Sequence, residues 1–573
     1  MLARSTIEKK GEVCRNPRAN RYVAQMQALV HAFMLRGIDA LPCEVEVHLS
    51  PHGLPQICVV GLPDAAIRES VERIRRAIEA SGFELPRHHV VVNLAPAGTR
   101  KEGAVYDLPI AMGVLAAGGT AEPKRANAPQ IERWLIAGEL ALDGRLRPIR
   151  GAVSAALLAR DSGRGIIVPF ENAMEAELVP GVQVIGAATL REVVEFFRGE
   201  GPPVASDGAS DGASAFTTEG IAIDDAKRSE RDERGLSGIA IADSVVAGIA
   251  LPEFAAGLAP VDFRDIKGQA IAKRAMLIAA AGGHNALLLG PAGCGKTMLA
   301  RALAGILPPL QPEEALEVMR IASSVGIEVV AGSRKSKLHI VRPVRAPHHG
   351  ASAVAIVGGG PSGRPGEITL AHHGVLFLDE LPEFRRDVLE ALREPLEGGE
   401  VLIARASGSV RWPAMTMLVA AMNPTARGDR SPGASGSRMM ADYLGRVSGP
   451  ILDRIDLHVE VRRVGARDLA RAKPGSSSDA LREQVIAARA RSLRRQGGAP
   501  NARLAVDVLD RHCRLDGAAA ELLVRGLEEL SLSARAYDKI RRVARTIADL
   551  AGESEVNSVC VAEALQFRAL GNR

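Results

Sequence analysis

One stretch in the middle of the chain constrains its fold more than any other. Residues 286–289 form an apolar run, the next eight residues match G-x-x-x-x-G-K-[ST], and residues 298–304 have helical character. A strand, a glycine loop and a helix in this order present backbone N–H groups and a helix N-terminus to phosphate groups. The pattern therefore predicts an α/β core that binds a nucleoside triphosphate. The predicted binding residues are Gly290, Pro291, Ala292, Gly293, Cys294, Gly295, Lys296, Thr297 and Met298.

Two side chains of this loop and two that follow a later strand predict the chemistry. Lys296 is expected to contact the β- and γ-phosphates, and the Thr297 hydroxyl to bind Mg²⁺. Residues 375–378 form a second apolar strand, which ends in Asp379 and Glu380. Hydrolysis needs a carboxylate that holds Mg²⁺ through water and a base for the attacking water. We assign Asp379 to the first role and Glu380 to the second, with ATP and Mg²⁺ as the expected cofactors.

The composition bounds the class of protein. With 573 residues the chain is too long for one hydrophobic core, and three or four domains are expected. Six scattered cysteines without C-x-x-C spacing favour reduced thiols and a cytoplasmic location over disulfides or a zinc site. The sequence has no run of eighteen apolar residues, so no membrane span is expected. A net charge of +5 allows an anionic partner without requiring one.

Changes in composition and periodicity suggest where the domains begin and end. Residues 1–25 are expected to form a disordered extension rather than a secretory signal, because the apolar stretch that follows holds glutamine and histidine and no cleavage site. Residues 26–197 alternate strands and helices, and 198–260 have the glycine-rich, charged composition of a linker. The P-loop core is expected at 261–465 and a helical lid at 466–573.

Apolar periodicity predicts the individual elements. In the first domain, strands are expected at 45–49, 56–60, 89–94, 134–140 and 165–168, and helices at 65–81, 107–117 and 152–160. In the core, a helix is expected at 270–281, a β-hairpin within 400–412 and a core strand at 417–424. Ser533 is the expected N-cap of a lid helix.

Several short motifs carry a family resemblance. Residues 62–64, 92–97, 107–109 and 138–140, together with the P-loop core, resemble the YifB/ComM family of magnesium-chelatase-like AAA+ ATPases. The resemblance implies an N-terminal domain similar to the Lon protease domain and to ribosomal protein S5 domain 2. Val105 and Val153 fall where Lon has its serine and its lysine, and valine can neither attack nor accept a proton. We therefore favour a docking or oligomerisation domain over a peptidase.

The same resemblance implies further site residues. Asn423 falls at the sensor-1 position, where an amide orients the attacking water. Arg454 falls in the arginine-finger segment and is expected to reach a neighbouring subunit of a homohexamer, and Arg535 is the sensor-2 candidate. Ile266 and Lys267 are expected near the adenine. The remaining basic residues of that lid helix are expected to be mostly solvated, namely Arg541, Arg542 and Arg545.

Two segments look like insertions of this branch. The first, 342–368, contains the pair His348 and His349. Adjacent residues of an extended chain face opposite ways, so we expect a structured pore or interface segment there and no metal beyond Mg²⁺. The second is the hairpin, whose Arg405 and Arg411 could contact DNA phosphates. The cysteine-rich segment that follows Asn423 in family members is absent.

Three functions remain open. The resemblance favours an ATP-driven ring motor on DNA, a branch-migration helicase in natural transformation, with recombination proteins as further partners and no membrane partner. A magnesium-chelatase-type subunit would use the same core motifs. A protein-remodelling ATPase, whose N-terminal domain recruits a partner, is the third alternative.

Overall fold

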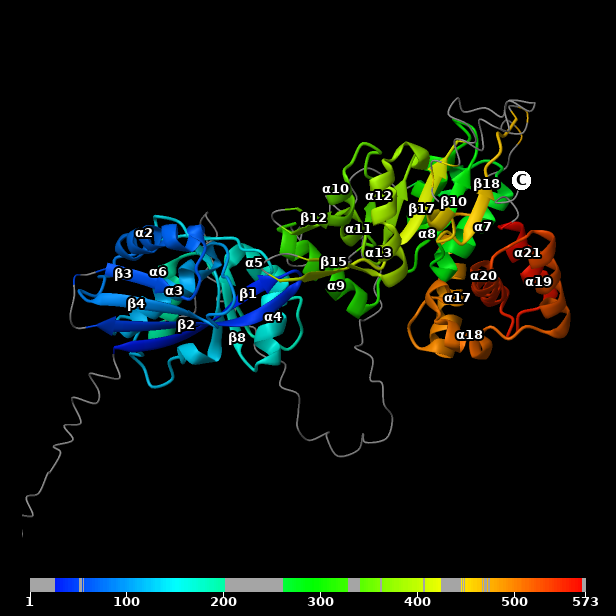
Figure 1. Ribbon diagram of the computed structural model, residues 1–573. Coiled ribbons are helices and arrows are strands. Elements are labelled where there is room, and N and C mark those ends of the chain that lie inside the picture. Colours follow the sequence, from blue (N-terminus) through cyan, green and yellow to red (C-terminus); the bar gives the residue numbers. More distant parts are fainter. Residues whose placement is uncertain are drawn as a thin grey trace, which may run out of the picture. The chain divides into compact units, whose positions relative to one another are not determined.

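The chain is described by a computed structural model in two compact units, Met1–Ser244 and Val245–Arg573 (Figure 1). The expected extension at 1–25 and nearly all of the expected linker lie outside the described residues, as does Arg405. The structure describes residues 26–50, 54, 56–200, 261–327, 341–360, 363–404, 408–423, 445, 447, 449–465, 467, 471 and 475–568.

The first unit is built on a seven-stranded mixed sheet in the order β3-β4-β2-β1-β5-β8-β9. Strands β1, β2 and β4 pair antiparallel, whereas β3 pairs parallel to β4 and β5, β8 and β9 pair parallel to one another. The strands of this unit are β1 (Gln27–Arg36), β2 (Asp39–Ser50), β3 (Gln56–Val60), β4 (His89–Ala95), β5 (Trp134–Ile136), β6 (Glu139–Leu140), β7 (Leu146–Arg147), β8 (Gly165–Pro169) and β9 (Val184–Ala187).

Helices cover this sheet and complete the core of the first unit. The Asp64 carboxylate caps α2 by accepting from the Ile67 N–H at 2.8 Å. Helix α3 is apolar on every side and nearly all of it is buried, which is typical of a helix at the centre of a core. The helices are α2 (Ala65–Ala80), α3 (Asp107–Ala117), α4 (Ala152–Asp161), α5 (Phe170–Ala176) and α6 (Leu190–Arg198).

A five-stranded sheet in the order β11-β14-β17-β10-β18 forms the centre of the second unit, and its neighbouring strands all pair parallel. Strand β10 carries the P-loop, and β17 lies between it and β14. The strands of the sheet are β10 (Ala286–Leu289), β11 (Val344–Arg345), β14 (Val375–Leu378), β17 (Met417–Met422) and β18 (Leu457–Glu460). Two short antiparallel pairs stand apart from it, β12 (Gly358–Gly359) with β13 (Arg364–Pro365) and β15 (Glu400–Ile403) with β16 (Val410–Pro413).

The helices of the second unit fall into two groups along the chain. Those of the sheet region are α7 (Ala270–Gly282), α8 (Lys296–Ile306), α9 (Pro312–Val325), α10 (Ala353–Val357), α11 (Glu367–Leu370), α12 (Arg386–Ala391), α13 (Arg393–Gly398) and α15 (Gly449–Leu452). Those of the C-terminal region are α17 (Ser478–Gln496), α18 (Val506–His512), α19 (Gly517–Glu529), α20 (Ala534–Ala551) and α21 (Ser558–Gln566). Apolar residues of both groups belong to one continuous core.

Most expected elements are confirmed, and the differences have physical reasons. The Ser533 hydroxyl caps α20 as expected. The expected strand at 134–140 is instead two short strands, β5 and β6, that belong to different sheets. Residues 342–368 are not simply an insertion, because they include β11, the edge strand of the central sheet.

The expectation that the basic residues of α20 are solvated is wrong. Arg541 is 8% exposed and Arg545 is 1% exposed. Arg541 pairs with Asp510 at 2.7 Å, and Arg545 pairs with Asp549 at 3.0 Å. Arg541 joins α20 to α18, whereas Arg545 pairs within α20 and also donates to the carbonyl oxygens of Glu553 and Ser554, which follow that helix. A buried guanidinium needs such partners. Both arginines are therefore structural residues rather than a surface for an anion.

Candidate nucleotide-hydrolysis site

The P-loop begins at Gly290, directly after β10, where the chain lies close to Val461, the residue after β18. A Cβ atom at Gly290 would lie 2.2 Å from the Val461 carbonyl oxygen and 2.8 Å from Cys294 Sγ, so only glycine fits there. Gly293 and Gly295 have φ angles of +75° and +97°, which L side chains rarely adopt. Such conformations let successive backbone N–H groups of a loop point toward its centre, next to the N-terminus of α8.

The Lys296 side chain lies inside this loop. Its Nζ donates to the carbonyl oxygens of Gly290 at 2.7 Å and Pro291 at 3.0 Å, and to Asn423 Oδ1 at 3.0 Å. Lys296 is 8% exposed. Asn423 follows β17, which places its amide between the P-loop and the end of β14. The structure thus brings together the lysine and the amide that the sequence singled out separately.

The acidic pair lies at the end of the next strand. Thr297 Oγ1 donates to Asp379 Oδ2 at 2.9 Å, and the Glu380 N–H donates to Asp379 Oδ1 at 2.9 Å. Glu380 has a φ of +54°, in the left-handed region, and its side chain is 52% exposed. A hydroxyl and a carboxylate held together are oxygen ligands of the kind that Mg²⁺ prefers, so these residues fit the ion.

Two contacts at this site were missed by sequence reasoning. His349 Nδ1 lies 3.5 Å from Glu380 Oε2. Gln269 Nε2 donates to the carbonyl oxygens of Cys294 at 3.2 Å and Arg462 at 2.5 Å, so it joins the P-loop to the segment after β18. Neither residue belongs to a motif with fixed spacing, and only the fold brings them close.

The other residues expected to contact the nucleotide differ in their exposure to solvent. Ala292 and Met298 are exposed, and Cys294 is half-buried. Ile266 is 4% exposed and packs into the core, whereas Lys267 is exposed.

The two arginines expected to complete the site lie elsewhere, in one pocket of about 380 Å³. Asp453, Asp456, Asp538 and Glu397 also line it. Its basic residues are Arg454, Arg503, Arg535, Lys539 and Arg542. Five cations against four carboxylates leave a small positive excess, and guanidinium groups such as those of Arg454 and Arg535 suit phosphate oxygens.

This basic pocket and the P-loop lie at opposite ends of the parallel strands. The pocket is near the N-terminal end of β10, and the P-loop follows its C-terminal end. Gly283 and Asn285 line the pocket and precede β10, whereas Gly290 follows it. Five residues of extended chain at about 3.3 Å each separate Asn285 from Gly290 by roughly 16 Å. The arginines that line the pocket therefore lie at the end of β10 opposite the P-loop of their own chain.

The Arg454 guanidinium is held in a defined position. Its Nε donates to the Arg393 carbonyl oxygen at 2.9 Å, its Nη1 to the Pro450 carbonyl oxygen at 2.8 Å, and its Nη2 to the Glu397 carboxylate. The side chain is 14% exposed. Arg535, in the first turn of α20, is exposed. The pocket thus combines a buried, hydrogen-bonded guanidinium and an exposed one.

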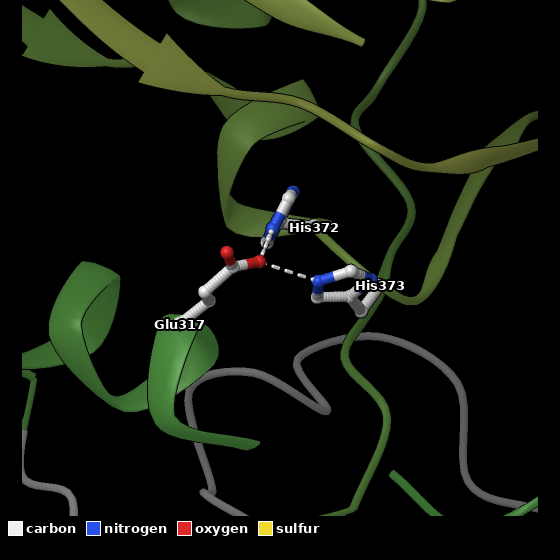
Figure 2. A group of neighbouring side chains, drawn as sticks. All are labelled: Glu317, His372 and His373. Atoms are coloured by element: carbon white, nitrogen blue, oxygen red, sulfur yellow. Dashed lines mark hydrogen bonds and ion pairs between the residues drawn. The ribbon is translucent and has the colours of Figure 1, made fainter. Parts of the chain in front are cut away.

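Figure 2 shows a third cluster, in which both His372 and His373 point at one carboxylate oxygen of Glu317. Their Nε2 atoms lie 2.9 Å and 2.7 Å from Glu317 Oε2. These three side chains are spaced as metal ligands could be. Adjacent histidines can therefore face the same way, and His373 has a φ of +55°. The rings of His348 and His349 also lie together, 4.0 Å apart, so our expectation that they face apart is wrong.

The proton positions of the cluster argue against a metal. The Met415 N–H donates to His372 Nδ1 at 2.9 Å, so this nitrogen is an acceptor. Burial lowers the pKa of His372, which keeps the ring neutral. A neutral ring with an accepting Nδ1 carries its hydrogen on Nε2, where a metal would need a lone pair. Both imidazoles instead donate to Glu317 and hold the pKa of its carboxyl well below its usual range.

The fold and the site together define a P-loop ATPase of the AAA+ class. Three family models match consecutive parts of the chain: "Subunit ChlI of Mg-chelatase" at residues 45–172, "Magnesium chelatase, subunit ChlI" at 262–469, and "Magnesium chelatase, subunit ChlI C-terminal" at 475–568.

Relatives of known name match over nearly the full length. The chain is 40% identical to "Competence protein ComM" of Haemophilus influenzae over 547 residues, which are 95% of this chain and 97% of that protein. It is 40% identical to YifB of Salmonella typhimurium over 95% of this chain and 97% of that protein. The "Magnesium-chelatase 38 kDa subunit" of Rhodobacter capsulatus is 28% identical over 40% of this chain and 69% of its own. The chain belongs to the YifB/ComM family of magnesium-chelatase-like AAA+ ATPases.

Membership of this family implies the use of ATP and Mg²⁺. Within the described residues, no helix has both the length and the apolar character needed to cross a membrane.

Proposed function

We propose that the protein is an ATP-hydrolysing ring motor that acts on DNA, with each active site shared between two subunits. The observation that carries the proposal is the division of the site. One end of the parallel strands holds the P-loop and the acidic pair, and the opposite end holds Arg454 and Arg535. In a ring, the basic pocket of one subunit can face the nucleotide of the next, and a homohexamer is the assembly we favour.

The residues of one subunit bind the triphosphate and prepare the attacking water. Backbone N–H groups of the P-loop bind phosphate oxygens, and Lys296 exchanges its carbonyl partners for the β- and γ-phosphates. Thr297 and Asp379 would hold Mg²⁺, which when bound neutralises charge on the phosphates. Glu380 accepts the proton of the water as it attacks, and Asn423 orients that water.

The residues of the neighbouring subunit stabilise the charge that develops on the γ-phosphate. Among the described residues, Arg454 uses three of its five guanidinium N–H donors, and further donors can serve phosphate oxygens. Arg535 on α20 is the second cation of the same pocket. A guanidinium supplied in this way to a phosphoryl-transfer site increases the rate by about 10³- to 10⁵-fold.

DNA is the substrate that we favour, because of the name of a relative and an exposed arginine on a hairpin. A full-length relative at 40% identity carries the name of a competence protein, which is consistent with branch-migration helicase activity in natural transformation. The hairpin β15–β16 presents Arg411, whose side chain is 71% exposed and pairs with Glu400 at 3.4 Å. Such exposed pairs are weak, so Arg411 remains available to a DNA phosphate. Recombination proteins would be natural partners, and the cytoplasm the place of action.

The division of labour along the chain is part of the proposal. Residues 26–197 would form a Lon-like domain used for docking or oligomerisation, since Val153 is fully buried and has no catalytic group. Residues 198–260 would be a linker that follows it. Residues 261–465 would then be the ATPase core, and 466–573 the lid.

The direct test is unwinding of forked or Holliday-junction DNA by the purified protein. We expect ATP-dependent unwinding that Glu380→Gln abolishes while nucleotide binding is retained. Arg411→Glu should lower the slope of log affinity for DNA against log salt by about 1. Arg75→Glu, which removes another exposed and paired arginine from the first unit (57% exposed, against 71% for Arg411), is the control. ATP-independent unwinding, or no DNA binding at low salt, would refute the motor.

One observation favours a second candidate, a magnesium-chelatase-type subunit. All three matching family models carry the name of chelatase subunit ChlI. However, the chelatase subunit of Rhodobacter capsulatus matches only 40% of this chain. Reconstitution of porphyrin metallation that depends on this protein would favour the chelatase over the DNA motor.

A further inference from the structure

Asn285 is the residue directly before the P-loop strand, and its side chain bonds to the start of β17 and to the segment before β18. Its Nδ2 donates to the Arg454 carbonyl oxygen at 3.0 Å, and its Oδ1 accepts from the Leu418 N–H at 2.8 Å. A carbonyl can only accept and a backbone N–H can only donate, so these partners fix the orientation of the amide. The two bonds therefore need a side chain with a donor and an acceptor in one plane.

The backbone of Asn285 adds to the same junction. Its carbonyl oxygen accepts from the N–H groups of Asp456 and Leu457, both at 3.0 Å. Its N–H donates to the Asp456 carboxylate at 3.3 Å. The residues that follow Arg454 are thus bonded to the residue directly before β10. The side-chain bond is the one that reaches Arg454 itself.

We propose that Asn285 is the positioning residue of the arginine finger. Its amide fixes the Arg454 backbone against the starts of β10 and β17, so that the guanidinium projects into the basic pocket at a set distance from the sheet. This inference rests on the proposed function, in which Arg454 acts on the neighbouring subunit's nucleotide. Asn285 itself touches neither that nucleotide nor the P-loop of its own chain.

Because of this position, a substitution at Asn285 should lower the turnover rate without changing nucleotide affinity. Asn285→Asp keeps the acceptor for Leu418 but sets a second carboxylate oxygen against the Arg454 carbonyl, which displaces the finger. A misplacement of about 1 Å at a catalytic group can cost about 100-fold in rate, so we expect kcat to fall by about 10- to 100-fold. The affinity of the variant for nucleotide should change little, because Gly290–Thr297 lies at the other end of β10.

Subunit mixing separates a defect in the finger from a defect in the subunit's own pocket. A subunit with Glu380→Gln has an inactive pocket but offers a normal finger, whereas one with Arg454→Ala has a normal pocket but offers none. Mixed rings of these two contain some interfaces with a complete site, so ATPase activity should return. Asn285→Asp should regain activity when mixed with Glu380→Gln subunits and should not regain it when mixed with Arg454→Ala subunits.

Each outcome of the mixing experiment decides a stated point. Rescue by Arg454→Ala but not by Glu380→Gln would place the defect in the P-loop and overturn the inference. No rescue by either would mean a general structural role and would also overturn it. Failure of Arg454→Ala and Glu380→Gln to rescue each other would instead refute the shared site, and with it the proposed function.

A second variant guards against a folding defect in Asn285→Asp. Asn285→Ala removes both side-chain bonds without adding charge, and it should fall in the same rescue class with nucleotide affinity retained. If neither variant binds nucleotide, Asn285 is required for the fold and not for the finger, which contradicts the proposal.

Discussion

The ion pair of Asp456 and Lys539 joins the two elements that carry the pocket arginines. Asp456 Oδ1 lies 2.7 Å from Lys539 Nζ, and the two side chains are 11% and 15% exposed. His284 Nδ1 lies 3.3 Å from the other carboxylate oxygen. Burial alone would raise the pKa of Asp456, yet the Lys539 ammonium and His284 hold it well below its usual range. Arg454 lies two residues before Asp456, and Arg535 lies one helical turn before Lys539.

Asp456→Asn should therefore destabilise the second unit strongly. The change leaves the Lys539 ammonium in its buried position without a counter-charge. Removal of one partner of a buried pair costs about 3–5 kcal/mol, and residual solvent exposure favours the lower end. At about 2–4 °C per kcal/mol for a unit of this size, the melting temperature should fall by roughly 6–12 °C. ATPase activity should fall in parallel, because the pair anchors α20.

The assay is differential scanning calorimetry of the full chain at pH 7.5, with a double-mutant cycle. Lys539→Met alone should also destabilise, whereas the double variant should lose less than the sum of the single losses, because no unpaired charge remains. The folded-state pKa of Asp456 lies below its unfolded value, so its contribution is present above about pH 4 and is lost as the pH falls further. Additive losses, or a melting temperature unchanged by Asp456→Asn, would refute this reasoning.

Three further changes test other parts of the structure. Gly290→Ala should weaken the binding of a fluorescent ATP analogue by about 5- to 150-fold, because the added Cβ would lie 2.2 Å from a carbonyl oxygen. The control Gly398→Ala, whose Cβ would meet nothing within 4 Å, should leave the affinity unchanged. Equal affinities of the two variants would contradict this prediction. Burial and Arg568 lower the pKa of His458 to about 3, so between about pH 6.5 and 3 only the unfolded state binds its proton and stability falls as the pH falls. Denaturant unfolding at pH 7 and 5 should show a loss larger by about 1–2 kcal/mol in the wild type than in His458→Gln, and equal losses would be inconsistent with a neutral buried ring. Glu317→Gln should lower stability by about 1–3 kcal/mol without a change in zinc content, and stoichiometric zinc that only the wild type retains would show that the cluster is a metal site after all.

The parts of the site that follow from local sequence could be predicted. Residues 286–297 specify their own strand, loop and helix, so Lys296 and Thr297 were assigned without the fold. Asp379 and Asn423 end strands of the same parallel sheet, and the carboxyl ends of such strands lie at one edge. Asp379 was assigned from the acidic pair that ends its strand and Asn423 from the family resemblance, and the parallel sheet accounts for their convergence on the P-loop.

The remaining features depend on contacts between distant segments. Asn285 is an isolated polar residue before an apolar strand, and only the packing of β17 and β18 against β10 gives it partners. Arg545 was expected to be solvated because it matches no family motif, and only the fold shows that it is buried. Arg454 and Arg535 were assigned by resemblance, and their common pocket became visible only once β18 and α20 were in position.

The most direct test of the shared site is the steady-state ATPase rate of Arg454→Ala at saturating ATP, with nucleotide affinity measured on the same preparation. Arg454 is far from the P-loop of its own chain, so affinity should remain close to that of the wild type. Loss of a guanidinium supplied by a neighbour should lower turnover by about 10³-fold or more. Turnover at the wild-type rate would contradict the account, because each subunit would then hydrolyse ATP without its neighbour.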